Sequence, residues 1–422
     1  MDEILNRVCS IVNHPVAQMD VKFRIGYVKG LGACLFLLSQ DSPITFFYFQ
    51  AWATSILKTP INVKTFWRND VDAIRSAVSL KHKGLWFFSM KKDFFFDVFY
   101  LLESSCIENY KQENAFTYLK DNICGVFTKG TLSKSHHAYK DKADLSFFNN
   151  VLVSHMQQNL VHLKLPEKRV LVVANVSAGK STLINALVGY RFNRTKTTAC
   201  TDKLVFIHNK CSKDGITCKI KNGVYTYSEN INEVNSDSLI EAALPFKSSL
   251  GKEKICFIDT PGINNADNCS HKQITEDIIK KGDYDVVLYV SNCQYFGTND
   301  EHKLLKFLKN NVTKPILFVL NQLDVFNPEE DSIHKMLNDY KSDLIQFGFR
   351  NPIIIPVSAY ASFLIRLEPS CLTKTEIRKK IDIIELFKDE YYDLPQYIRQ
   401  GNSSDILDKT GIKILENKIL TV

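Results

Sequence analysis

From residue 165 onward, short continuous apolar runs alternate with longer segments in which apolar residues recur at helical spacing. Apolar runs of about five residues are typical of strands buried on both faces of a parallel sheet, and helices between them are the connections that such a sheet needs. We therefore predict an α/β fold with a doubly wound, mostly parallel sheet, whose strands lie near residues 170–174, 203–207, 254–258, 285–290, 316–320 and 353–356.

The first third of the chain has a helical pattern instead. Apolar residues recur at three- and four-residue spacing over 23–38, and Ser42 followed by Pro43 is the cap and first position of a second helix. The run 94–102 is apolar on nearly every face, which predicts a buried helix, with a strand as the alternative. We predict an all-α domain over residues 1–135.

A polar segment, residues 128–142, follows this domain and is predicted to be a linker. The second predicted domain covers residues 143–422. It begins and ends with amphipathic helices, at 143–163 and 411–420.

Composition narrows the picture only slightly. The chain has 422 residues and a net charge of +7, which is mild for its length and makes a nucleic acid an unlikely partner. Its 11 cysteines lack the paired spacing of a zinc site, and the early charges Asp2, Glu3 and Arg7 interrupt any secretory signal. The apolar stretch 31–57 is divided by a turn at Asp41, so core helices are favoured over a membrane hairpin. We expect a cytoplasmic protein, with peripheral membrane contact as an option.

The first candidate binding segment follows the strand at 170–174. It reads as a phosphate-binding P-loop in which Ala174 replaces the first glycine. Backbone N–H groups cradle the phosphates, Gly179 permits the turn, Lys180 contacts the outer phosphates, and Ser181 is a ligand of Mg²⁺. The predicted nucleotide-binding residues here are Asn175, Val176, Ser177, Ala178, Gly179, Lys180, Ser181 and Thr182.

Two later segments have the residues of nucleotide-sensing switches. Thr201, with Thr198 as the second choice, precedes a strand and can complete the Mg²⁺ shell. Asp259 ends another strand and can hold Mg²⁺ through water, while Gly262 can offer its N–H to the γ-phosphate.

The segment after the strand at 316–320 predicts which base is bound. A carboxylate at Asp324 can accept hydrogen bonds from both N1–H and the 2-amino group of guanine, which adenine does not offer. Asn321 braces the loop and Gln322 lies against the base. After the strand at 353–356, backbone N–H groups of Ser358 and Ala359 are expected to meet the guanine O6.

These five motifs in order define a P-loop GTPase, and the segment 175–189 is similar to the dynamin-like GTPases, particularly bacterial ones. The switch segment ending at Thr201 and the Asn321-Gln-Leu-Asp324 motif share this resemblance. It covers about residues 143–422 and implies GTP as substrate, Mg²⁺ as cofactor, and a GTP-dependent homodimer or a partner GTPase, often at a membrane. It also implies that helices 143–163 and 411–420 pack together as a small bundle.

The chain departs from that family at several positions. Val176 stands where several dynamins have a water-orienting glutamine, and Ile263 is also apolar. Catalysis is therefore assigned to Lys180, Ser177, Thr201 and a dimer partner. We expect no stalk after residue 422.

Residues 27–57 resemble the TerB-like helical domains, with only Asp41 of their acidic cluster present.

The leading hypothesis is a GTP-hydrolysing dynamin-like protein that couples its nucleotide state to dimerisation and to movement of the helical domain. One alternative is a GTP-regulated assembly module with little turnover. Another is a ribosome-associated GTPase of the Era type.

Overall fold

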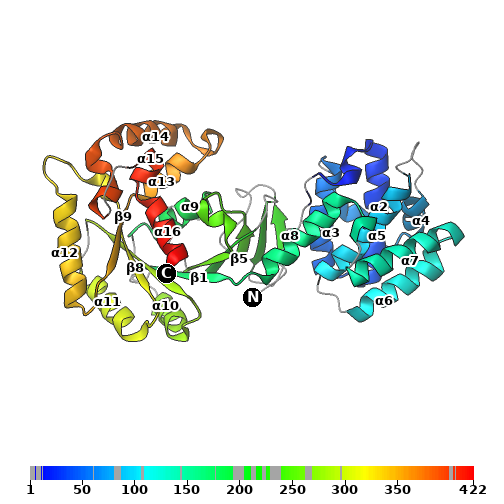
Figure 1. Ribbon diagram of the computed structural model, residues 1–422, viewed down its shortest axis with the longest axis horizontal. Helices are drawn as coiled ribbons and strands as arrows, with labels where there is room; N and C mark the ends of the chain where they lie inside the picture. The colour runs from blue at the N-terminus through cyan, green and yellow to red at the C-terminus, as the bar shows by residue number, and fades with distance from the viewer. Residues whose placement is uncertain are drawn as a thin grey trace. The chain divides into compact units, whose positions relative to one another are not determined.

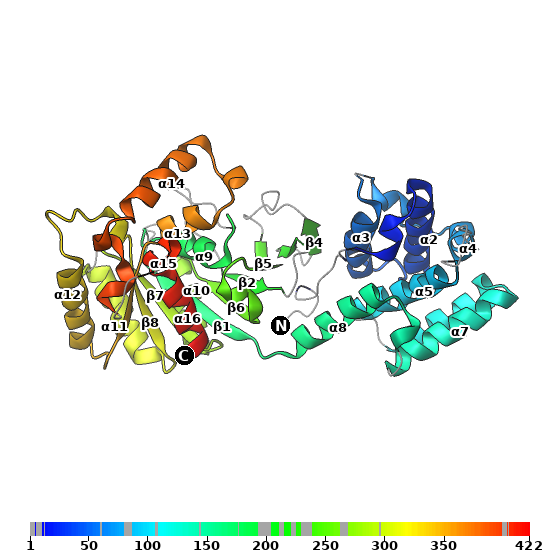
Figure 2. The same ribbon diagram turned by 45° about the horizontal axis from the view of Figure 1, so that its top comes forward.

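The computed structural model describes residues 5, 11, 13–59, 61–79, 87–105, 109–142, 145–175, 177–192, 204–210, 215–220, 225–228, 239–261, 269–294, 297–398, 403 and 405–422. The chain divides into two compact units (Figure 1 and Figure 2). Unit 1 comprises Met1–Leu165 and Lys210–Glu229, and unit 2 comprises Pro166–Asn209 and Asn230–Val422.

Unit 1 is built from helices around an aromatic core. Its helices are α2 (Val21–Ser39), α3 (Pro43–Leu57), α4 (Val71–Ser79), α5 (Phe87–Ser104), α6 (Asn109–Tyr118), α7 (Val126–Asp141) and α8 (Asn150–Lys164). Short turns of helix lie at η1 (Pro15–Gln18), η2 (Val63–Phe66), η3 (Leu119–Ile123) and η4 (Leu145–Phe147), and the antiparallel strands β3 (Ile216–Ile220) and β4 (Tyr225–Ser228) also belong to this unit.

The start signals read from the sequence act as predicted in this unit. Ser42 caps α3, since its side chain accepts a hydrogen bond from the Thr45 N–H, and Pro43 is the first helical residue. The apolar run 94–102 lies in helix α5, and every side chain in it except Asp97 belongs to the buried hydrophobic core. Helices α2 and α4 pack so closely that a Cβ at Gly30 would lie 2.2 Å from that of Ala77, so this contact requires glycine.

The predicted linker at 128–142 is wrong, because α7 covers residues 126–141. Leu132, Ser135 and Tyr139 lie on one buried face of this helix, and Tyr139 packs against Phe96 and Phe99 of α5. Most of the exposed residues between 129 and 141 are polar, so this part of the helix has the composition of a loop.

The predicted helix at 143–163 corresponds to η4 and α8. Its apolar residues Leu152 and Met156 are part of the aromatic core of unit 1. The C-terminal helix α16 (Ile412–Thr421) instead packs in unit 2, against β9 (Ile353–Val357) and η7 (Ser249–Lys252). The apolar faces of the two helices are thus each covered within their own unit, and the pairing of the two as one bundle stays a prediction.

Unit 2 contains the doubly wound sheet that the apolar runs predicted. Within it the strand order is β5-β2-β6-β1-β7-β8-β9, and of the neighbouring pairs β2–β6 is antiparallel whereas the others are parallel. The strands are β1 (Lys168–Ala174), β2 (Val205–Asn209), β5 (Leu239–Leu244), β6 (Ile255–Asp259), β7 (Val286–Asn292), β8 (Ile316–Asn321) and β9.

Helices cover both faces of this sheet. In Figure 1, α10 (Cys269–Lys281), α11 (Asn299–Asn311) and α12 (Ile333–Gln346) lie on one side, while α9 (Lys180–Val188), α13 (Ala359–Arg366) and α16 lie on the other. The unit also contains α14 (Lys374–Leu386), α15 (Ile406–Lys409) and the short turns η7, η8 (Leu323–Val325), η9 (Pro369–Cys371), η10 (Glu390–Tyr392) and η11 (Leu394–Tyr397).

The topology fixes where a ligand can bind. Strand β1 lies between β6 and β7, and all three strands are parallel, so their carboxyl ends meet at one edge of the sheet. Ligands of doubly wound sheets bind at this edge, where the connections diverge to opposite sides. The P-loop segment follows β1 at this edge.

Over the described residues, no helix is both long enough and apolar enough to span a membrane.

Candidate functional site

The loop after β1 has the tight turn that its sequence predicts. Strand β1 ends at the fully buried Ala174, and α9 begins at Lys180. Ser177 and Gly179 have φ values of 65° and 87°, in the left-handed region. A Cβ on Gly179 would lie 2.3 Å from Asn321 Nδ2, so only glycine fits at this position. The N-terminus of α9, with the half-buried Ser181 and Thr182 in its first turn, therefore follows this loop directly.

Lys180 and Asp259 form a buried ion pair at the centre of this edge. The Lys180 ammonium contacts Asp259 Oδ1, and the two side chains are 8% and 0% exposed. Asp259 ends β6, which pairs directly with β1. The structure thus brings together the residue predicted to contact phosphates and the residue predicted to hold Mg²⁺.

Asn321 joins three loops through its side chain. Its Nδ2 donates to the Ala178 carbonyl oxygen at 2.9 Å, and its Oδ1 accepts from the Ala359 N–H at 3.0 Å. Gln322, at φ 71°, donates from Nε2 to the Ser177 carbonyl oxygen at 3.2 Å. The loops that follow β1, β8 and β9 are therefore fixed to one another, as the bracing role predicted for Asn321 requires.

Asp324 is held by Ser358 across the same edge. The Ser358 hydroxyl donates to Asp324 Oδ1 at 2.6 Å and also caps α13 by accepting from the Ala361 N–H. Burial raises the pKa of the Asp324 carboxyl above its usual value, and the Ser358 hydrogen bond opposes that rise. The side chain expected to recognise guanine therefore has a fixed orientation.

The backbone N–H groups predicted to meet the guanine O6 already have partners in this structure. The Ala359 N–H donates to Asn321, and the Ser358 N–H donates to the Thr410 carbonyl oxygen at 3.0 Å. A contact from either group to a base would require one of these hydrogen bonds to be exchanged.

Three predicted site residues, Val176, Thr201 and Gly262, lie outside the described residues. One site residue was missed. Asn292, at the end of β7, donates from Nδ2 to the Ser177 carbonyl oxygen at 3.4 Å and so supports the P-loop. The available signal was its position, a polar residue directly after a continuous apolar run.

Comparison with known proteins agrees with this geometry. Residues 170–323 match the model described as the Dynamin family. The GTPase Era of Campylobacter hominis is 25% identical over 236 residues, which cover 56% of this chain and 62% of that protein. The chain therefore spans somewhat less than two thirds of the length of this relative.

Three solved structures each have a low similarity to this chain. Toc33 from Arabidopsis thaliana with Mg²⁺ and GMPPNP is 15% identical and covers 54% of this chain and 88% of that one, with a TM-score of 0.32. Era from Aquifex aeolicus bound to GDP and AlF₄⁻ is 18% identical, with coverages of 58% and 61% and a TM-score of 0.29. Era with MgGDPNP and nucleotides 1506–1542 of 16S ribosomal RNA is 19% identical, with coverages of 57% and 60% and a TM-score of 0.29.

Because these TM-scores are low, the fold assignment here depends on the strand order of unit 2 and on the loops that it brings together. The family match independently covers most of β1, the P-loop, β6, β8 and most of the Asn321–Asp324 segment. The dynamin-like resemblance predicted from the sequence is thereby confirmed at the level of a GTPase domain.

Proposed function

We propose that this protein binds Mg²⁺-GTP at the carboxyl edge of β1, hydrolyses the terminal phosphate, and couples the nucleotide state to dimerisation and to movement of the helical unit. The observation that carries the proposal is the Asn321 side chain, which holds the P-loop and the two loops of the base-binding region in one arrangement. Phosphate and base contacts made by separate loops are then part of one site.

Nucleotide binding would exchange the partners of the Lys180–Asp259 pair. A buried ion pair satisfies both charges while no phosphate is present. Lys180 would then be free to contact the outer phosphates, and Asp259, Ser181 and Thr201 are the residues that would hold Mg²⁺, which would neutralise phosphate charge. Each charge then keeps an opposite charge beside it throughout the exchange.

Guanine recognition would depend on the ionised Asp324. Its carboxylate accepts from N1–H and the 2-amino group, while the Ser358 hydroxyl fixes one of the two oxygens. Adenine has an acceptor at N1 and no 2-amino group, so it would offer no donor to this half-buried carboxylate, which would keep only the Ser358 hydroxyl.

Hydrolysis needs a group that orients water, and Val176 and Ile263 are apolar. We therefore assign the chemistry to Lys180, Ser177 and Thr201, completed by a dimer partner. Ser177 is exposed at the apex of the P-loop, where a second molecule can reach it. Peripheral contact with a membrane is the setting that we propose for such a dimer.

Two alternatives follow from specific observations. The apolar Val176 and Ile263 favour a GTP-regulated assembly module with little turnover. The identity with Era favours a ribosome-associated role. The prediction that a nucleic acid is an unlikely partner has no support from these comparisons, since one Era structure contains 16S ribosomal RNA.

A nucleotide titration tests the binding proposal. We expect the native chain with Mg²⁺ to bind GTP far more tightly than ATP, and Lys180→Ala to weaken GTP binding by about 100-fold or more, since a buried charged contact to phosphate is lost. Lys306→Ala, at an exposed position on α11, is the control and should bind as the native chain does. Equal affinity for ATP and GTP, or undiminished binding by Lys180→Ala, contradicts the proposal.

Turnover separates the enzyme from the assembly module. Single-turnover GTP hydrolysis that accelerates with protein concentration is expected of a dimer-activated enzyme. A very slow rate that is independent of concentration favours the module. Co-sedimentation with liposomes in one series and with ribosomes in another distinguishes the membrane setting from the Era-type role.

A further inference from the structure

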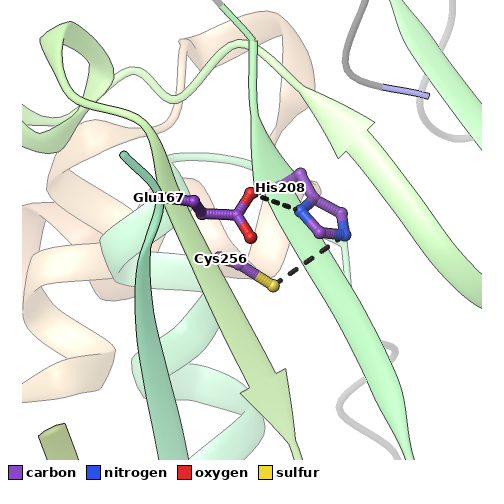
Figure 3. Close-up of side chains that lie close together, drawn as sticks. All are labelled: Glu167, His208 and Cys256. Atoms are coloured by element: carbon purple, nitrogen blue, oxygen red, sulfur yellow. Dashed lines mark hydrogen bonds and ion pairs between the residues drawn. The ribbon is translucent and has the colours of Figure 1, made fainter. Parts of the chain in front are cut away.

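Three residues with metal-ligating side chains meet at the end of β1 opposite the P-loop. Glu167 directly precedes β1, His208 lies on β2, and Cys256 lies on β6 (Figure 3). One ligand atom from each lies within 4.8 Å of those of the other two. The antiparallel register pairs His208 with Cys256, so the strand backbones themselves place these two side chains together.

The cluster is closed to solvent. The side chains of Glu167 and His208 are 3% and 4% exposed, and Cys256 is 0% exposed. His208 Nδ1 lies 2.9 Å from Glu167 Oε1, and Nε2 lies 3.9 Å from Cys256 Sγ. The thiol is also 3.7 Å from the Phe257 carbonyl oxygen.

A fourth residue completes the surroundings of the histidine. Glu241, on the neighbouring strand β5, places Oε1 2.9 Å from His208 Nε2. An ion bound at Nδ1, on the side of Glu167, would leave the Nε2–H directed at the Glu241 carboxylate. This is the arrangement that orients a metal-ligating histidine in proteins, where a carboxylate accepts from the second ring nitrogen.

We propose that Glu167, His208 and Cys256 form a binding site for a thiophilic divalent cation, of which Zn²⁺ is the representative, with Glu241 holding the imidazole. A thiolate, an imidazole and a carboxylate are the three donor types that zinc takes in proteins. Three protein ligands leave one position of a tetrahedral ion for water. The ion would fasten β1, β2 and β6 to one another at their buried ends.

Charge balance is compatible with an ion at this position. With a proton on each ring nitrogen, His208 would donate to both Glu167 and Glu241. Binding of a divalent cation would release one imidazole proton and the thiol proton. Two positive charges replace two protons, and the net charge of the buried cluster is unchanged.

This site is distinct from the Mg²⁺ position of the nucleotide. The two lie at opposite ends of the seven-residue strand β1, which at about 3.3 Å per residue separates them by roughly 20 Å. Mg²⁺ prefers oxygen ligands, whereas this cluster offers sulfur and nitrogen as well. Excess Mg²⁺ should therefore not compete for it.

Cobalt substitution tests the proposal in the full chain. The reduced, chelator-treated protein is titrated with Co²⁺, and we expect a thiolate-to-cobalt charge-transfer band that saturates at about one equivalent and is removed by Zn²⁺ but not by Mg²⁺. Cys256→Ser and His208→Gln should lack the band. Glu241→Gln should keep it with an affinity about 10–100-fold lower, because it removes only the acceptor behind the imidazole.

Controls make the result decisive. Cys371→Ser, at an exposed free cysteine, should titrate like the native chain. Zn²⁺ should also raise the unfolding temperature of the native chain and of Cys371→Ser, and not that of Cys256→Ser. Absence of the band in the native chain, or a band that persists in Cys256→Ser variants with native circular dichroism, overturns the proposal.

Discussion

The two units bury carboxylates in different ways. In unit 2, Asp259 contacts the Lys180 ammonium, and Glu416 contacts the Arg366 guanidinium. In unit 1, Asp93 and Asp97 lie four residues apart on α5, one helical turn from each other. His14 contacts Asp97 at 3.0 Å, and Tyr27 donates to the same oxygen at 2.8 Å.

The consequence of this difference is a proton retained in unit 1. Burial, followed by repulsion from Asp97, raises the pKa of Asp93 to about 7, although His14 and Lys92 oppose the rise. The comparison shows that Asp259 and Glu416 each have a cation as partner, whereas two aspartates one turn apart on α5 raise the pKa of Asp93.

The two ion pairs of unit 2 also differ in whether a ligand can separate them. Asp259 and Lys180 lie at the candidate nucleotide site, where a ligand can exchange them. Arg366 and Glu416 join α13 to α16 away from any loop of that site, and Arg366 also donates to the Ala186 carbonyl oxygen of α9. Asp324 is intermediate, since a hydroxyl and not a cation holds it.

The largest expected effect comes from removing one partner of the permanent pair. Arg366→Met leaves Glu416 buried and without its cation, and should lower the free energy of unfolding of unit 2 by about 3–5 kcal/mol. Denaturant unfolding measures this. The double variant Arg366→Met/Glu416→Met should recover most of the loss, whereas Lys388→Met, at the exposed pair with Glu385, should change stability by less than about 1 kcal/mol.

Removing the charge of Asp93 should instead raise the free energy of unfolding. The folded state keeps the Asp93 proton up to about pH 7, whereas the unfolded chain releases it near pH 4, so this group lowers stability as pH rises through that window. Asp93→Asn should therefore match the native chain near pH 4 and exceed its unfolding free energy by about 4 kcal/mol at pH 8.

Unfolding of the full chain at a series of pH values measures this difference. The control is Asp72→Asn on α4, whose carboxylate is 94% exposed and should leave the pH profile of stability unchanged. An Asp93→Asn variant that is less stable than the native chain at pH 8 would show that the carboxylate is ionised and well compensated.

A smaller effect is expected at the hydroxyl that holds Asp324. Ser358→Ala removes the hydrogen bond that favours the ionised carboxylate, so the already raised pKa of Asp324 should rise further. We expect about fivefold weaker GTP binding at neutral pH, from a contribution of about 1 kcal/mol, and an affinity that falls at a higher pH than in the native chain. Ser358→Thr keeps the hydroxyl and should bind GTP as the native chain does.

Much of unit 2 could be predicted from sequence because its signals are local. Continuous apolar runs identified six of the seven strands described in unit 2, whereas β5 was not predicted. Gly179, Lys180 and Asp324 follow strand ends at fixed spacing. The helix α7 was not predicted, because only two of its described buried residues, Leu132 and Tyr139, are apolar, whereas Thr128 and Ser135 are polar.

The cluster at the other end of β1 could not be predicted, since it joins residues far apart in the chain. Glu167, His208 and Cys256 have no common spacing, and they meet only because β2 runs antiparallel to β6. Likewise, the sequence does not reveal that the Ala359 N–H is taken by Asn321. Sequence reasoning therefore identified contacts within motifs and missed those that depend on strand order.

Base selection by Asp324 is the most direct test of the central claim, and an exchange of nucleotide preference measures it. Xanthine has an oxygen where guanine has its 2-amino group, so the amide of Asp324→Asn can accept from N1–H and donate to that oxygen. Calorimetric titration should show that the native chain prefers GTP to XTP and that Asp324→Asn prefers XTP, each by about 100-fold or more. An Asp324→Asn variant that still prefers GTP would contradict guanine recognition at this site.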